Sequence, residues 1–157
     1  MKKVLFALIL LGCIACSESE EVDPREAYFL ESIIGSWAYD TVRVDGVTYL
    51  YQHTEGCVKD LFQFYNVEGK EFDFEEEVVL NCSNCAECAL SQTGLEWKLK
   101  GDNIKLYFGS QLVLVYKIIE VDDTKFIYQV ELDYDNDGDN DLLEITAVKY
   151  DPYDRFN

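Results

Sequence analysis

The stretch LEWKLKGDNIKLYF, residues 95 to 108, decides the fold of this chain. Its first six residues alternate apolar and charged side chains without a fault, which is typical of a strand with one face in a core and one in water. Gly101, Asp102 and Asn103 then supply a turn, and a second strand is expected from Ile104 to Phe108. The stretch therefore predicts an antiparallel β-hairpin.

Hairpin patterns of the same kind recur on both sides of this stretch. The pair Asp45-Gly46 separates two apolar runs and is typical of a two-residue turn in which both central residues have positive φ. A short helix is expected over residues 25 to 34, because Pro24 suits a helix start and Gly35 follows. Further strands are expected at residues 37–44, 47–51, 61–65, 71–79, 111–121, 125–132 and 142–150.

These strands predict one all-β domain over residues 25–157. The eleven tyrosines, nine phenylalanines and two tryptophans of the chain favour strands, and all but Phe6 lie in this segment. A short-looped antiparallel meander protects its edges most simply by closing on itself. We therefore expect an antiparallel up-and-down barrel of eight or nine strands, preceded by the short helix.

The first sixteen residues predict a lipid anchor. Lys2 and Lys3 precede an apolar run far shorter than the roughly 20 residues of a spanning helix, and a small residue precedes a cysteine. This pattern resembles the signal peptide of a bacterial lipoprotein, which implies that a cysteine at the cleavage site carries lipid. We assign residues 1–15 to the signal and the lipid to Cys16. Cys13 is the alternative, but it would leave a very short signal and an unpaired Cys16.

The segment after the anchor, residues 16–24, is acidic and reads as a solvated tether. An acidic stretch in this place resembles the signal that sends some lipoproteins to the outer face of the outer membrane, and the alternative is a plain spacer. Removal of Lys2 and Lys3 with the signal changes the formal charge from −18 to −20. Nucleic acid is therefore excluded as a partner, and membrane association is expected to rest on the lipid. We expect a location at the outer membrane, on its periplasmic or cell-surface face.

Several short motifs resemble the lipocalin-like lipoproteins of Gram-negative bacteria. They are Gly35-Ser36-Trp37 after the short helix, Gly56 to Asp60 before an aromatic strand, and Gly94-Leu95-Glu96-Trp97. The resemblance covers about residues 32–150 and implies a lipocalin-like barrel that binds a small apolar ligand. Trp37 and Trp97 are expected to pack in the floor of the barrel. Whether the barrel is hollow or filled is left open by the sequence.

An acidic segment predicts a structural calcium site. Residues 133–144 fit the pattern D-x-[DN]-x-[DN]-G-x5-E, and Ca²⁺ takes six to eight oxygen ligands. Because strands flank the segment, it resembles the D-x-D-x-D-G-x-x-D calcium hairpins of integrin-type propellers more than an EF-hand. The alternative is an acidic, hydrated turn. The expected ligands are Asp133, Asp135 and Asp137, the carbonyl of Asp139, and Asp141 or Glu144 as the closing carboxylate.

Four cysteines of the domain, Cys57, Cys82, Cys85 and Cys88, are expected to form disulfides, because the predicted compartment is oxidising. The residues alone allow three pairings. The lipocalin-like resemblance implies a bridge from Cys57 to the later cluster, which we assign to Cys82, leaving Cys85 with Cys88. A strained bridge in the cluster would keep a thiol- or metal-sensing role as a minor hypothesis.

Nothing in the sequence predicts an enzyme. His53, the only histidine, lies in a polar loop and is expected to be exposed, and no nucleophile elbow, phosphate loop or isolated acid pair is present. The sequence therefore predicts a lipid-anchored, non-enzymatic protein that binds a small apolar ligand, with binding residues that the sequence does not identify. The alternatives are a filled barrel that docks onto an envelope protein, and a thiol or metal sensor.

Overall fold

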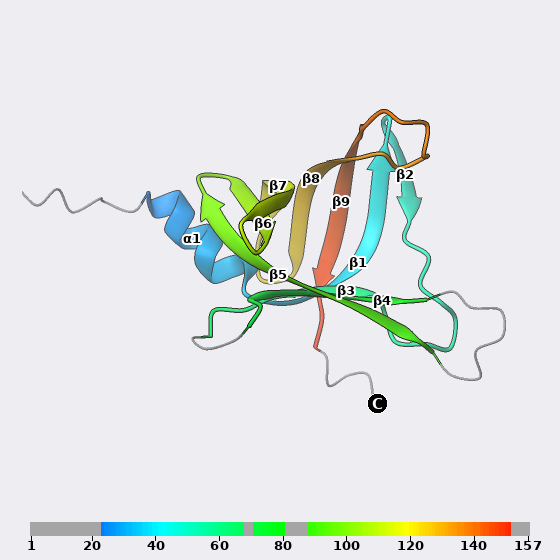
Figure 1. Cartoon of the computed structure of the whole chain (residues 1–157), viewed down its shortest axis with the longest axis horizontal. Helices are drawn as coiled ribbons and strands as arrows, with labels where there is room; N and C mark the ends of the chain where they lie inside the picture. The colour runs from blue at the N-terminus through cyan, green and yellow to red at the C-terminus, as the bar shows by residue number, and fades with distance from the viewer. Residues whose placement is uncertain (1–22, 68–70, 81–87, 152–157) are drawn as a thin grey trace, which may run out of the picture.

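The computed structural model describes residues 23–67, 71–80 and 88–151. One helix precedes nine strands along this part of the chain (Figure 1). The elements are α1 (Pro24–Ile33), β1 (Gly35–Val44), β2 (Val47–Leu50), β3 (Leu61–Phe64), β4 (Phe74–Val79), β5 (Leu90–Lys100), β6 (Asn103–Phe108), β7 (Gln111–Val121), β8 (Lys125–Leu132) and β9 (Asp141–Lys149). The predicted helix and strands are thus confirmed, with shifts of a few residues at their ends. In the part of the chain that the structure describes, no helix is long and apolar enough to cross a membrane.

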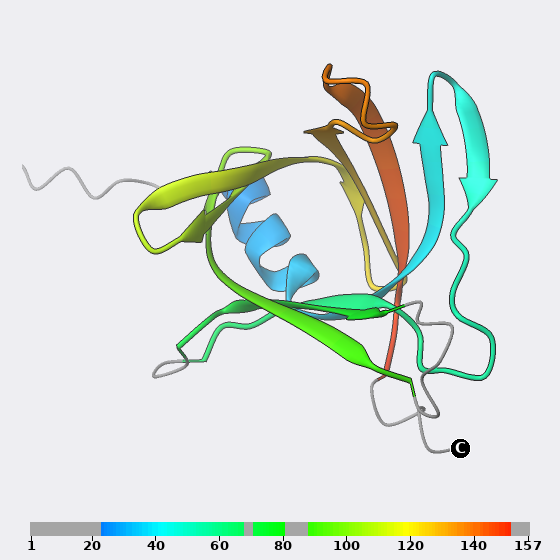
Figure 2. The same cartoon turned by 45° about the vertical axis from the view of Figure 1, so that its right-hand side comes forward.

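The sheet closes into an antiparallel up-and-down barrel of eight strands, as expected (Figure 2). Strands β3 to β9 follow one another in sequence order, and β1 pairs with β9 to close the wall. The other edge of β1 is shared, because Gly35 to Ala38 pair with β3 while Thr41 to Val44 pair with β2. Strand β2 is therefore an appendage of β1 at one end of the barrel.

The β1–β2 hairpin turns as the sequence predicts. Asp45 has a φ of 51° and Gly46 a φ of 80°, so both central residues occupy the left-handed region. The hairpin projects beyond β3 at the same end of the barrel as the loop between β8 and β9 (Figure 1). Both loops therefore border one opening.

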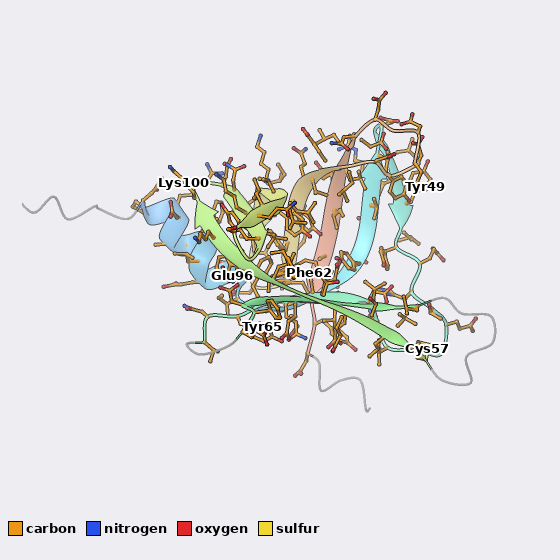
Figure 3. All side chains as sticks on the ribbon, viewed as in Figure 1. Tyr49, Cys57, Phe62, Tyr65, Glu96 and Lys100 are labelled. Atoms are coloured by element: carbon orange, nitrogen blue, oxygen red, sulfur yellow. A yellow bond between two sulfur atoms is a disulfide. The ribbon has the colours of Figure 1, made fainter. Side chains whose placement is uncertain are left out.

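The opposite end of the barrel is filled by aromatic side chains. Phe62 lies at its centre, with rings 5.9 to 6.3 Å away on Phe64, Phe74 and Phe126 (Figure 3). Trp37 is fully buried among them, as expected. Side chains that nearly or completely lack solvent contact here are Trp37, Phe62, Phe64, Phe74 and Phe126.

Helix α1 covers this filled end. Its Phe29 and Ile33 are buried, and the Trp37 indole Nε1 donates a 2.8 Å hydrogen bond to the Ile33 carbonyl. That bond satisfies one of the carbonyls that a helix end leaves without a partner. Trp97 is partly buried against the edge of Phe64, and its Nε1 donates to the Tyr65 carbonyl at 3.2 Å. Both tryptophans thus pack as the sequence predicts.

Inward-facing side chains become exposed toward the other end. Along β8 the exposed fraction rises from 1% at Tyr128 to 3% at Val130 and 37% at Leu132. Along β7 it rises from 5% at Tyr116 to 47% at Leu112. The barrel therefore has a closed floor near α1 and an open end bordered by the two loops.

Candidate functional site

A cavity of about 540 Å³ lies at the open end. It is bounded by strands β1 and β2, the residues that follow β2, and the loop after β8. Figure 3 shows Tyr49 on β2, in the wall of this end. Because Tyr49 pairs with Val42 across the two strands, both side chains lie on the inner face. The lining residues are Val42, Tyr49, Leu50, Tyr51, Gln52 and Tyr134.

Below this cavity, a cluster of tyrosines and one carboxylate occupies the interior. Tyr51 stacks on Tyr39 with 4.9 Å between ring centroids, and the Tyr39 hydroxyl donates a hydrogen bond to the Glu76 carboxylate. Tyr116 and Tyr128 stack on each other at 4.3 Å. Glu76 faces inward on β4, because it pairs directly with the buried Phe62 of β3. The cavity thus has aromatic walls and a partly polar floor.

Burial keeps the hydroxyls of this floor protonated. Desolvation is the largest cause that raises the pKa of Tyr39, Tyr116 and Tyr128, and the negative charge of Glu76 raises all three further. Tyr51 has a raised pKa for the same reason, with a further contribution from its hydrogen bond to Asp60. At neutral pH these groups are therefore hydrogen-bond donors and not anions.

The loop that carries Tyr51 is fixed by a buried carboxylate, Asp60. Its Oδ2 accepts a 2.9 Å hydrogen bond from the Tyr51 hydroxyl and its Oδ1 accepts one of 2.6 Å from the Val79 amide. The Asp60 amide donates to His53 Nδ1 at 3.1 Å, and His53 Nε2 lies 2.9 Å from the Tyr39 carbonyl oxygen. This set of bonds requires a neutral imidazole with its proton on Nε2.

The expectation of an exposed His53 is therefore wrong. Its side chain is 21% exposed and ties the loop after β2 back to β1. The physical reason is that the loop returns across the end of β3, where Asp60 fixes it. The sequence places a carboxylate, Asp60, immediately before an apolar strand, but its partner Val79 lies far along the chain. No sequence pattern predicts that these two residues are in contact.

The acidic hairpin brings together part of the predicted calcium site. Carboxylate oxygens of Asp133, Asp135 and Asp137 lie within 4.8 Å of one another, and all three residues are exposed. The loop bends at Asn136 and Gly138, which have φ values of 61° and 99°. Three predicted ligands thus converge on one side of this bend.

The other three predicted ligands lie differently. The Asp141 carboxylate accepts a hydrogen bond from the Tyr134 amide at 3.1 Å, and the Asp139 amide donates to Asp137 at 2.9 Å. Glu144 lies on β9, where it contacts Arg43 at 3.4 Å and Gln129 at 3.3 Å. Its place within a strand, with cationic and amide partners, removes Glu144 from the loop.

A disulfide joins Cys57 to Cys88, with an S–S distance of 2.04 Å. Cys57 lies in the loop before β3 (Figure 3), and Cys88 lies two residues before the start of β5. The expected bridge from Cys57 to the cluster is thus found, but its assignment to Cys82 and the pairing of Cys85 with Cys88 are wrong. The lipocalin-like resemblance does not say which cysteine of the cluster pairs with Cys57, and the fold brings the last of them, Cys88, to it. Cys82 and Cys85, and the lipidation candidates Cys13 and Cys16, lie outside the described residues.

A groove of about 430 Å³ follows the seam between β7 and β8. The two strands pair only from Lys117 of β7 onward, so the first half of β7 separates from β8. Val113 and Val115, exposed on β7, and Leu142 on β9 supply apolar side chains to it. This groove is therefore a second recess with apolar side chains, in addition to the cavity at the open end.

Sequence reasoning missed the interior cluster. Glu76 belongs to the run Glu75-Glu76-Glu77, which reads as a solvated strand face. Strict alternation along a strand would have placed the middle glutamate opposite to its neighbours, on the apolar side. The sequence indicates the tyrosines only as strand formers.

Comparison with known proteins finds no matching family model, no matching curated protein and no matching solved structure.

Proposed function

We propose that this chain is a lipid-anchored, non-enzymatic protein of the cell envelope that binds a small, largely apolar ligand in the open end of its barrel. The observation that carries the proposal is the 540 Å³ cavity, which has aromatic walls above a closed floor. A cavity of this size matches the sites that take small organic molecules, which are lined mainly by apolar and aromatic side chains. The lipocalin-like order of the elements and the lipoprotein-like first sixteen residues support the same proposal.

The floor explains why a ligand would stop at the open end. Trp37, Phe62 and Phe126 pack at centroid distances of 5.5 to 6.0 Å, which leaves the α1 end to the protein's own side chains. Tyr49 and Tyr134 are each more than half exposed and flank the entrance from β2 and from the acidic loop. Burial of these two rings by an apolar ligand would supply the main favourable contribution to binding.

A neutral fluorescent probe, N-phenyl-1-naphthylamine, tests this proposal. The wild-type domain should enhance its fluorescence with saturation at one site. The double change Tyr49→Ala and Tyr134→Ala should weaken binding by about tenfold, since each lost aromatic contact is worth of order 0.5 to 1.5 kcal/mol. A Val113→Ala and Leu142→Ala control, in the β7–β8 groove, should leave it unchanged. Absence of saturable binding to the folded wild type would overturn the proposal.

The groove supports a second candidate function, docking of an envelope protein. The first half of β7 has no partner strand on the side that faces β8, so its backbone groups there are unpaired with any described strand. An extended peptide can pair with such an edge as an additional strand. The Val113→Ala and Leu142→Ala variant distinguishes the two functions, because it would lose partner binding and keep the probe.

We also propose that the acidic hairpin binds Ca²⁺ as a structural ion. The convergence of Asp133, Asp135 and Asp137 within 4.8 Å supports this proposal, since uncompensated carboxylates at such distances repel one another and a divalent cation offsets that repulsion. Asp139 in the loop and Asp141 at the start of β9 would complete the oxygen ligands through small changes in the loop. Bound Ca²⁺ would fix the loop that carries Tyr134 at the entrance.

A further inference from the structure

One charged group, the Glu76 carboxylate, faces the interior of the barrel without a cationic partner. Phe62 lies directly opposite on β3 and Thr93 on β5, which places Glu76 on the inner face between a buried ring and an exposed hydroxyl. Among the described residues, the Tyr39 hydroxyl donates a hydrogen bond to it. A carboxylate has room for about four hydrogen-bond donors, so one hydroxyl leaves most of its capacity unused.

The basic side chains of the barrel point elsewhere. In the described part of the chain, no lysine or arginine is paired with Glu76. Six cations of β1 and β5 to β8 lie on the outer face by strand alternation, because the residues next to them that face inward are buried or half-buried: Arg43, Lys98, Lys100, Lys105, Lys117 and Lys125. Lys149 lies at the filled end, with its Nζ 4.2 Å from the centroid of Trp37 and 2.6 Å from the Ile34 carbonyl oxygen. Lys149 pairs with Trp37 and so shares the inner face at the filled end, but elsewhere the described inner face of the wall carries no basic side chain.

Aromatic faces connect this carboxylate to the cavity at the open end. Tyr51 lines the cavity and stacks on Tyr39, whose hydroxyl is bonded to Glu76. Burial and the neighbouring Asp60 are the larger causes of the raised pKa of Tyr51, and the charge of Glu76 adds to them. Glu76 lies behind Tyr39 and does not itself line the cavity, so its charge attracts a cation there from below, while the π faces of the lining tyrosines attract it through their quadrupoles.

We propose that the open end selects an organic ammonium ion, primary or quaternary, with Glu76 as its counter-ion and tyrosine rings as its walls. This inference rests on the proposed function, because it names the ligand class of the same cavity. A formal charge of −18 on the chain favours the approach of such a cation over that of an anion. Because an apolar body would contact the same rings, the ligand class is an amphipathic amine.

Choline and its uncharged isostere 3,3-dimethylbutan-1-ol test the proposal on the purified wild-type domain. The two molecules have nearly the same shape and differ in the positive charge, so their difference measures recognition of the cation. Isothermal titration should give a dissociation constant for choline at least about tenfold lower than that for the alcohol. Glu76→Gln should remove this preference, and Glu77→Gln, an outward-facing change of the same net charge on the same strand, should keep it.

Thermal melts of both variants separate loss of binding from loss of folding. The proposal is overturned if the alcohol binds as tightly as choline, if neither molecule binds, or if folded Glu76→Gln keeps the preference. Its failure is distinguishable from failure of the proposed function, because the neutral naphthylamine probe requires no charge. Binding of that probe without selection of choline would leave an apolar binder with no cation site.

Discussion

Asp60 shows how a single residue holds the candidate site. Its two oxygens and its amide connect Tyr51 and His53, in the loop after β2, with Val79 at the end of β4. Asp60 is 4% exposed, and its bond to the Val79 amide is buried, while its bonds to Tyr51 and His53 are partly buried. The position of Tyr51, and with it one wall of the cavity, depends on this residue.

Asp60→Ala is expected to destabilise the domain by about 2 to 4 kcal/mol, because it leaves the Val79 amide and the Tyr51 hydroxyl buried without a partner. The measurement is the midpoint of urea unfolding followed by tryptophan fluorescence. Asp40→Ala, at an exposed aspartate of β1, is the matched control and should change the free energy of unfolding by about 0.5 kcal/mol or less. Equal effects of the two changes would show that Asp60 has no special role.

The buried tyrosines predict a loss of stability in alkali. Their folded-state pKa values lie above the unfolded value of about 10, so the folded state binds protons that the unfolded state releases. The stability they contribute is therefore full below pH 10 and falls as the pH rises beyond it. Absorbance at 295 nm should show Tyr39, Tyr116 and Tyr128 ionising only together with unfolding. Smooth ionisation of all tyrosines near pH 10 in a folded protein would contradict the burial.

At the scale of elements, local pattern was sufficient wherever a strand alternates. Leu95 to Lys100 and the Asp45-Gly46 turn are confirmed, because a period of two and a pair of positive φ values are local properties. The sharing of β1 between β2 and β3 was not predicted, because the residues of either partner fit its edge equally well. The partner of Cys57 was wrong for a similar reason, since four cysteines without a register leave the pairing open.

The acidic hairpin gives a prediction for an element. Millimolar Ca²⁺ should raise the melting midpoint by a few degrees, since a ligand bound by the native state alone at a hundredfold excess over its Kd adds about 2.7 kcal/mol. Asp135→Ala combined with Asp137→Ala should abolish most of this rise and leave a folded barrel. Glu131→Ala combined with Glu144→Ala, which changes the same net charge on the neighbouring strands, should keep the response. A midpoint equal in Ca²⁺ and in chelator, with no heat of binding, would identify the hairpin as an acidic turn.

For the whole molecule, the closed barrel followed from the sequence and the site did not. The number and order of strands set the closure, whereas the cavity depends on which inward side chains are large at each level of the barrel. Phe62 and Phe126 fill one level, whereas Val42, Tyr49 and Tyr51 border the cavity at another. Those differences arise from register between strands far apart in the chain, which a single sequence does not provide.

The proposed anchor makes a prediction for the molecule in its cell. Globomycin, which blocks cleavage of lipoprotein signals, should cause a larger precursor to accumulate. Cys16→Ala should release the protein from membranes, and Cys13→Ala should leave it attached. The opposite result for the two variants would move the lipid to Cys13. A protein that stays soluble with both cysteines intact would show that the segment is an ordinary secretory signal.

The central claim, a small-molecule site in the open end of the barrel, is tested most directly by locating a bound probe. Isotope-edited nuclear Overhauser spectra of the domain with N-phenyl-1-naphthylamine report which protein protons lie within about 5 Å of it. We expect contacts from the probe to the rings of Tyr49, Tyr51 and Tyr134, which border the cavity. Contacts confined to Val113, Val115 and Leu142 in the outer groove, or none to a folded domain at saturating probe, would contradict the claim.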